Sequence, residues 1–365
     1  MSFKFSPSSA PWLARLTILL AFISPSIQKT LYSRAHTIDD VFHIKTGTTL
    51  GGCDNYDVVQ WWNDGRTLAG SADQVLRSAR TAKANGVINS DSQMHLWTFF
   101  KVDAAEDSFE STVDRMIGDL QKVRDAIDDE SEGDDGDDKP WIFCDSTFLT
   151  EMKWTATALI EGTGEQDPEG RQMRKVYEGI YEVNYLEVKK RRNAASKTER
   201  AKMPLPFVPF WSEDLKAFRY DEPGDYCSKG RGSQKTNMGA TDDNLQPNTL
   251  TFCPQNWGDA ARYPNMFQFP DVTAEGMSLE EYTTEAMTFL HEMFHFALEV
   301  ENTPDTAYLL GEIVGSIALA DGATITQEQA IKNPESWTLF ALACYLGERF
   351  PDYSWASTKS KLRES

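Results

Sequence analysis

The sequence is poor in histidine, in positive charge and in long hydrophobic runs. It holds five histidines in 365 residues, and its 36 lysines and arginines are outnumbered by 56 aspartates and glutamates, for a formal net charge of −20. Phosphate backbones and anionic lipid surfaces repel such a chain, so we expect neither nucleic acid nor membrane as a partner. No apolar run is long enough to span a bilayer, no N-x-S/T glycosylation acceptor occurs, and no internal repeat is found.

The N-terminus has the features of a secretory signal peptide. Lys4 and Arg15 supply positive charge, Leu16–Ile23 forms a short apolar core, and Ser24–Ser26 offers small residues for cleavage. A disordered N-terminus with a chance apolar run is the alternative. We predict that residues 1–26 are a signal peptide and that the protein is secreted and extracellular.

Hydrophobic periodicity predicts a mainly helical chain. Apolar residues recur at three- and four-residue steps from Asp57 to Ala84 and from about Ser108 to Ile127, as they do on one face of a helix. Short apolar runs at Trp141–Cys144 and Leu250–Pro254 predict strands, and a further helix is expected within Leu159–Val188. The 40% of hydrophobic residues are ample for a folded core.

Two charged runs interrupt this pattern. Asp128–Asp138 is almost entirely acidic. Oxygen ligands at alternate positions would suit calcium, but the run lacks the spacing of an EF-hand loop, and mutual repulsion favours a solvated loop. Lys189–Arg192 is either a dibasic processing site or the charged end of a helix. We favour the helix end, because a cut there would separate the first helices from the histidine motif that follows.

That motif spells H-E-x-x-H from His291 to His295, within an apolar, helix-compatible run. Positions i and i+4 lie on one face of an α-helix, so both imidazoles can reach one metal ion, and Glu292 can reach a water bound to that metal. A chance match on an amphipathic helix is the alternative. The scarcity of histidine and a predicted helix start at Ser278, with Glu281 completing a capping box, favour the metal site.

A catalytic zinc site takes three protein ligands and leaves one position open. No third histidine follows His295. The downstream carboxylates are Glu301, Asp305, Glu312, Asp321, Glu328 and Glu335. Asp305 follows Pro304, which ends helical geometry, so the chain can turn back and bring this short carboxylate to the metal. We favour Asp305 as the third ligand; Glu335 either competes with it or orients a ligand histidine.

The segment after the motif resembles that of a known family. Thr303, Asp305 and Tyr308 match the G-T-x-D-x-x-Y-G pattern that follows H-E-x-x-H in the aspzincins, the deuterolysin-like and peptidyl-Lys metalloendopeptidases of fungi, while Asn302 and Leu309 replace its two glycines. The resemblance implies an α+β, mainly helical zincin-like metallopeptidase fold with a small sheet. It also implies that the strand before the motif helix, Leu250–Pro254, is the edge along which the substrate lies.

The resemblance assigns a role to each site residue. His291, His295 and Asp305 would bind Zn²⁺, Glu292 would act as the general base, and the hydroxyl of Tyr308 would stabilise the oxyanion. We therefore predict a secreted zinc metalloendopeptidase that acts on a protein or peptide substrate as a monomer. A secreted, non-proteolytic protein for metal capture is the alternative, but metal capture needs neither Glu292 nor Tyr308.

Five cysteines in an exported chain predict disulfide bonds and one leftover thiol, and the sequence alone leaves their connectivity open. The resemblance implies that Cys53 pairs with Cys144 and Cys227 with Cys253, which leaves Cys344 as a free, buried thiol.

The predicted organisation of the chain follows from these features. We predict a signal peptide at 1–26, an N-terminal extension at 27–50, a catalytic domain at 51–350 with insertions at 128–139 (the acidic loop) and 148–222 (an extra segment), and a C-terminal tail at 351–365.

Overall fold

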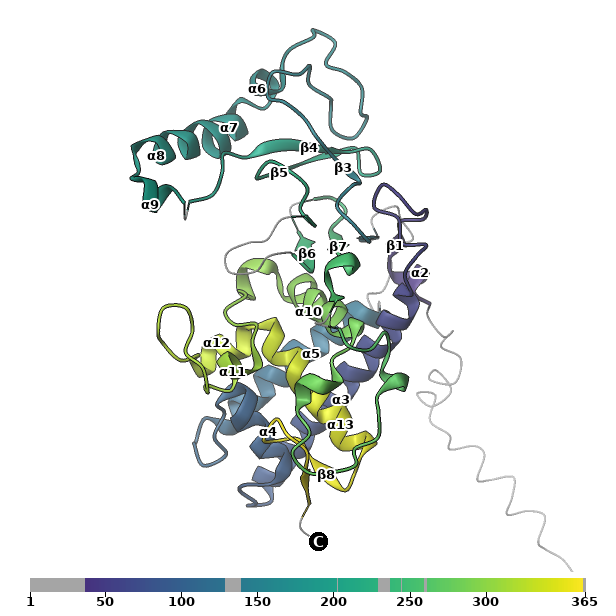
Figure 1. Cartoon of the computed structure of the whole chain (residues 1–365), viewed down its shortest axis with the longest axis vertical. Coiled ribbons are helices and arrows are strands. Elements are labelled where there is room, and N and C mark those ends of the chain that lie inside the picture. The colour runs from purple at the N-terminus through teal and green to yellow at the C-terminus, as the bar shows by residue number, and fades with distance from the viewer. Residues whose placement is uncertain are drawn as a thin grey trace, which may run out of the picture.

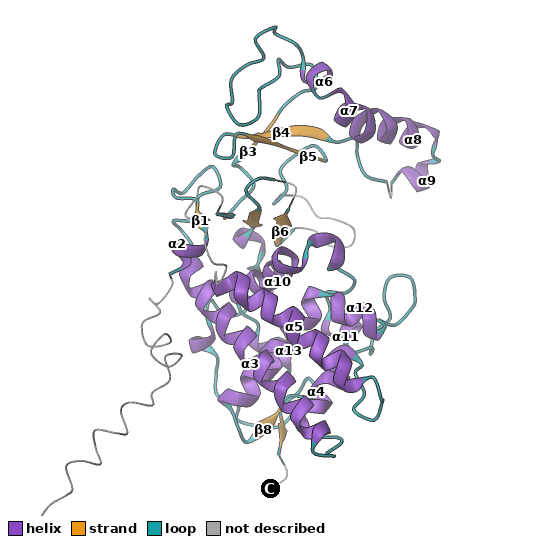
Figure 2. Cartoon of the chain, turned by 180° about the vertical axis from the view of Figure 1, so that it is seen from behind, coloured by secondary structure: helices purple, strands orange, loops and turns teal. Residues whose placement is uncertain are grey.

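The computed structural model describes residues 37–128, 139–201, 203–228, 237–243, 245–258 and 261–363. The predicted signal peptide and most of the acidic run lie outside these residues. Within them the chain is mixed α/β and dominated by helices, with sheets of four, three and two strands (Figures 1 and 2). This confirms the α+β class of the prediction. No helix in the described ranges is long and apolar enough to cross a membrane.

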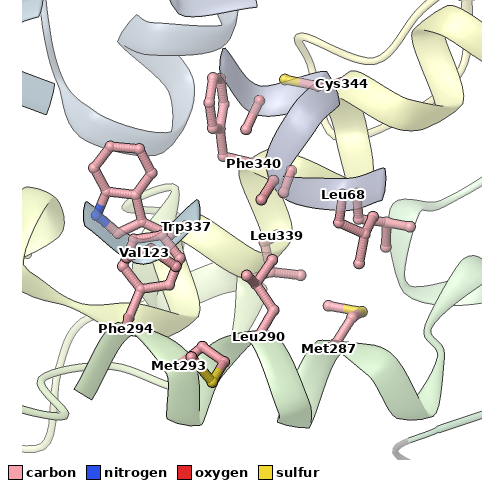
Figure 3. Close-up of a cluster of buried hydrophobic side chains, with 14 of the residues drawn as sticks. Leu68, Val123, Met287, Leu290, Met293, Phe294, Trp337, Leu339, Phe340 and Cys344 are labelled. Carbon is pink, nitrogen blue, oxygen red and sulfur yellow. The ribbon is translucent and has the colours of Figure 1, made fainter. Parts of the chain in front are cut away.

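Four long helices build the main core. They are α3 (Val58–Ala84), α5 (Phe109–Asp128), α10 (Glu285–Leu298) and α13 (Pro334–Arg349). Most of the periodic apolar residues that predict α3 and α5 are buried, and Val75 and Ile117 are partly buried. Phe294 of α10 stacks on Trp337 of α13, and Leu290 of α10 lies beside Leu339 (Figure 3). The shorter α4 (Asp91–Phe100), which the periodicity did not predict, completes this layer.

A four-stranded sheet lies beside α10, in the order β1-β2-β7-β6. Its strands are β1 (His43–Ile44), β2 (Trp141–Phe143), β7 (Thr249–Phe252) and β6 (Gly239–Asp242). The first three run parallel, and β6 pairs antiparallel with β7. The predicted strand at Leu250 exists, but its predicted place at the sheet edge is wrong. It is paired on both sides, and β6 forms the edge.

The extra segment forms a small unit of its own at one end of the molecule (Figure 1). Its antiparallel sheet holds β3 (Leu149–Glu151), β4 (Val208–Ser212) and β5 (Ala217–Asp221). Its helices are α6 (Met173–Val176), α7 (Glu178–Tyr181), a π-helical turn (Glu182–Glu187), α8 (Val188–Ala194) and α9 (Lys197–Arg200). Trp154, Met173 and Trp211 form its separate hydrophobic core. The basic run 189–192 lies within α8, as the favoured interpretation predicts.

The start of the motif helix differs from the prediction. Ser278 and Glu281 do form a capping box, but they cap a short 3₁₀ helix, Leu279–Tyr282. The backbone of Thr283 and Thr284 is then extended, and α10 begins at Glu285. Tyr263 stabilises this extended backbone with two hydrogen bonds. Its N–H donates to the Thr283 carbonyl, and its carbonyl accepts from the Glu285 N–H.

Both ends of the described chain belong to the main body. α2 (Ile38–Val41) packs into the main core, and β1 pairs with β2. Near the C-terminus, β8 (Tyr353–Ser354) pairs with β9 (Lys361–Leu362), and Trp355 between them is fully buried.

The disulfide bonds confirm the expected pairing. Cys53 is bonded to Cys144 and Cys227 to Cys253. Cys344 is free and buried, and burial raises the pKa of its thiol well above the usual value. Two disulfides fit a protein that folds in an oxidising compartment.

The two disulfides should differ in their contribution to stability. Cys53 and Cys144 are 91 residues apart, whereas Cys227 and Cys253 are 26 apart. Loop closure in the unfolded chain then predicts contributions of about 4.6 and about 3.5 kcal/mol. Replacing Cys53 and Cys144 by alanine should therefore lower the free energy of unfolding more than replacing Cys227 and Cys253, as measured by denaturant titration. A larger loss from the second pair would contradict this order.

Candidate metal centre

His291 and His295 are one turn apart on α10 and point into one site. Both are buried, and the Oδ1 atom of Asp305, from the loop after the helix, lies 3.1 Å from His291 Nε2 and 3.2 Å from His295 Nε2. The ligand atoms of these three residues all lie within 4.8 Å of one another. The group could therefore hold a metal ion.

The spacing and chemistry of the donors fit a tetrahedral site. With zinc–ligand bonds of about 2.0–2.2 Å, neighbouring ligand atoms of a tetrahedron lie about 3.3–3.6 Å apart. The distances from Asp305 Oδ1 to the two Nε2 atoms come within a few tenths of an ångström of that ligand–ligand separation. Two imidazoles and one carboxylate suit zinc and other divalent transition metals, and they leave a fourth position for water or substrate.

Each histidine is oriented through its other ring nitrogen. His291 Nδ1 lies 3.1 Å from Glu335 Oε2, and His295 Nδ1 lies 2.9 Å from the hydroxyl of Thr303. That hydroxyl donates to the Glu299 carbonyl, so it accepts the Nδ1 proton of His295. Both Nε2 atoms are thereby left for the metal side, as in other sites where outer partners fix the tautomer. Glu335 lies where the orienting role would place it.

Asn333 shapes the loop that carries Asp305, a function that the sequence did not reveal. Its side-chain oxygen accepts from the N–H groups of Thr306 and Ala307, and its amide donates to the Ala307 carbonyl. Asn333 is fully buried at the start of α13. The loop is thus held against the same helix that carries Glu335.

The charges of the group are strongly coupled. Burial raises the pKa of Asp305, but hydrogen bonds from His291 and His295 outweigh it and hold that pKa well below the usual range. Burial disfavours the charged form of His291, yet Asp305 and Glu335 raise the pKa of its imidazole well above the usual value. A metal ion must therefore displace a proton from this group, so metal affinity should fall as the pH falls.

Glu292 is buried beside the group and faces the edge strand β6. The hydroxyl of Thr241 lies 3.0 Å from both Glu292 Oε2 and the Glu292 carbonyl oxygen. A Cβ atom on Gly239 would lie only 2.7 Å from Glu292 Oε1, so this glycine leaves the space that the carboxylate fills. Burial raises the pKa of Glu292 above its usual value. The carboxylate thus has one fixed place against β6.

Tyr308 lies at the more open side of the group. Its ring stacks on that of His291, with centroids 6.2 Å apart, and 42% of the residue is exposed. Burial of the hydroxyl and the negative charge of Asp305 raise the pKa of this phenol far above the usual range. Tyr308 therefore keeps its proton at neutral pH and can donate a hydrogen bond. The structure brings all five predicted site residues together, while their catalytic roles stay predictions.

The geometry separates the predicted effects of Asp305 and Glu335. Asp305→Ala leaves two protein ligands and should weaken zinc binding more than any outer change. Glu335→Ala removes a partner of His291 and should cost about 10- to 100-fold in affinity. Competition with a chromophoric chelator measures both. His43→Ala is the control: the His43 ring contacts Trp141 outside the site, so this variant should bind zinc as the parent does. A greater loss in Glu335→Ala than in Asp305→Ala would make Glu335 the ligand.

Comparison with known proteins adds no family to this geometry. The chain matches no protein-family model, no curated protein and no solved structure. The aspzincin resemblance therefore stays a prediction based on the residues from His291 to Tyr308, and a function has to be argued from the site itself.

Proposed function

We propose that the protein is a secreted zinc-dependent endopeptidase of the aspzincin type. The observation that supports this most directly is the place of Glu292. A buried carboxylate lies next to a group of two imidazoles and one carboxylate, and both Thr241 and Gly239 fit around it. A site that only held a metal would not need this additional carboxylate.

The residues of the site suit peptide hydrolysis. Zinc bound there would lower the pKa of a water molecule to about 7 and polarise the peptide carbonyl. Glu292 accepts the proton of the attacking water on its carboxylate and passes it to the nitrogen of the leaving amine. The hydroxyl of Tyr308 donates to the carbonyl oxygen as that oxygen gains negative charge.

The edge strand β6 offers a place for the peptide backbone. Cys253 N–H donates to the Met238 carbonyl, and Ala240 lies opposite Thr251 in the antiparallel pair. Hydrogen-bonded pairs alternate along such a ladder, so the backbone groups of Gly239 and Thr241 point away from β7. A peptide can add to this edge as a further strand. It would then lie beside Glu292, whose carboxylate packs on the same strand.

Protein hydrolysis by the matched pair Glu292→Gln and Glu280→Gln tests the proposal. Glutamine cannot take the proton of the water, so Glu292→Gln should retain zinc and the fold but lose about 10²- to 10⁴-fold in the rate of casein or peptide hydrolysis. Glu280→Gln makes the same change at an exposed site outside the metal centre and should keep the parent activity.

Two outcomes would contradict the proposal in different ways. If Glu292→Gln cleaves as fast as the parent, Glu292 is not the base. If the parent binds zinc tightly but cleaves no protein or peptide, non-proteolytic metal capture becomes the better function.

A further inference from the structure

A pocket of about 390 Å³ lies on one face of the three-stranded sheet of the extra segment. The register pairs Glu151 with Phe210 and Phe210 with Arg219. Side chains alternate between the faces of a strand, so Leu149 and Asp221 share this face, while the opposite face carries the small hydrophobic core. All five of these residues line the pocket.

This face is turned toward β6 of the four-stranded sheet. Arg219 forms an ion pair with Asp242 at the end of β6, at 3.1 Å. Tyr226, which follows β5 in the chain, also lines the pocket, and its hydroxyl donates to the Gly239 carbonyl at 2.6 Å. The pocket therefore adjoins the proposed peptide edge, and Tyr226 stands between the two.

The charged groups around the pocket have partners within the protein, except that no hydrogen-bond partner is found for the Nη1 atom of Arg219. Arg219 pairs with Asp242 and Asp221, and its guanidinium lies 5.3 Å from the centre of the Tyr226 ring. Asp225 accepts from the hydroxyls of Ser146 and Ser228 and from the Cys227 N–H. The apolar part of the pocket wall is formed by Leu149, Phe210 and the ring of Tyr226. Most of the pocket surface is apolar.

Tyr226 also limits how far a peptide can follow β6. Gly239 and Thr241 are the residues whose backbone groups point outward from the edge, and the Gly239 carbonyl already accepts from Tyr226. An added strand can pair with Thr241, but it meets the Tyr226 hydroxyl at Gly239. The peptide must turn away from β6 there, beside the mouth of the pocket.

We propose that this pocket is a subsite for a large apolar side chain, preferably aromatic, of the peptide that pairs with β6. The aromatic ring would pack on Leu149 and Phe210, and the neighbouring guanidinium of Arg219 favours the face of a ring. The inference rests on the proposed peptidase function, because that function places a peptide on β6. The subsite is formed by the extra segment and by residues just before and after it, and it includes none of the candidate metal ligands.

Peptide binding to zinc-loaded Glu292→Gln protein tests the subsite without cleavage. The probes are alanine-based peptides with phenylalanine at each position in turn, and the same set with lysine. At one position phenylalanine should bind about 10- to 100-fold more tightly than alanine, the effect of burying one large apolar side chain. Leu149→Trp fills the pocket and should remove this preference. Val183→Trp, on the exposed surface of the same unit, should keep it.

The outcomes test the subsite proposal separately from the proposed peptidase function. Equal binding of all peptides, preference for lysine at every position, or a preference unchanged by Leu149→Trp would overturn the subsite, even if the parent protein cleaves casein. A phenylalanine preference that Leu149→Trp abolishes would support it, even if the parent cleaves nothing. If Leu149→Trp fails to fold, a crystal structure of the peptide complex decides by showing the ring inside the pocket or elsewhere.

Discussion

The site depends on one constraint, the burial of three ionisable side chains on a helix that also forms the core. α10 packs Leu290 and Phe294 into the main core and carries His291, Glu292 and His295, all buried, on its remaining surface. Burying such groups costs several kcal/mol unless each polar atom finds a partner. Three segments supply these partners: Thr241 on β6, Thr303 and Asp305 in the loop after α10, and Glu335 at the start of α13. The segments around α10 must therefore supply hydrogen-bond partners for its buried polar side chains.

The edge strand β6 supplies the surroundings of the buried Glu292 carboxylate. Its central residues fit around Glu292, Gly239 by lacking a side chain and Thr241 by its hydroxyl. Its two ends are held by residues at the border of the extra segment, through Arg219 on Asp242 and Tyr226 on Gly239. Arg219 of the extra segment and Tyr226, which follows that segment, thus help to position β6, and β6 in turn positions the Glu292 carboxylate. A segment that looks like a separate insertion in the sequence is in this way joined to the metal centre.

The sequence predicts those elements that depend on residues close together in the chain, and it does not predict those that depend on distant contacts. Helices α3 and α5 follow from apolar periodicity because each buries a continuous stripe. The helix α4 was missed although its capping box, Ser90 with Gln93, is visible in the sequence. The capping box at Ser278 was found but misassigned, because the extended break at Thr284 depends on pairing with the distant Tyr263. Strand β6, Gly-Ala-Thr-Asp, has no strand pattern at all and exists through pairing with β7 and contact with α10.

The metal ligands show the same division between local and distant information. His291 and His295 are predicted by helical spacing alone, since one turn of helix brings their rings together. Asp305 needs a loop of defined shape, and that loop is held by Asn333, the residue just before α13 and 28 residues further along the chain. The resemblance to a family motif supplied Asp305 because it condenses such distant contacts into a short pattern. The family motif identified the residues that come together. In this chain they are brought together by the contacts of Asn333, Thr303 and β6.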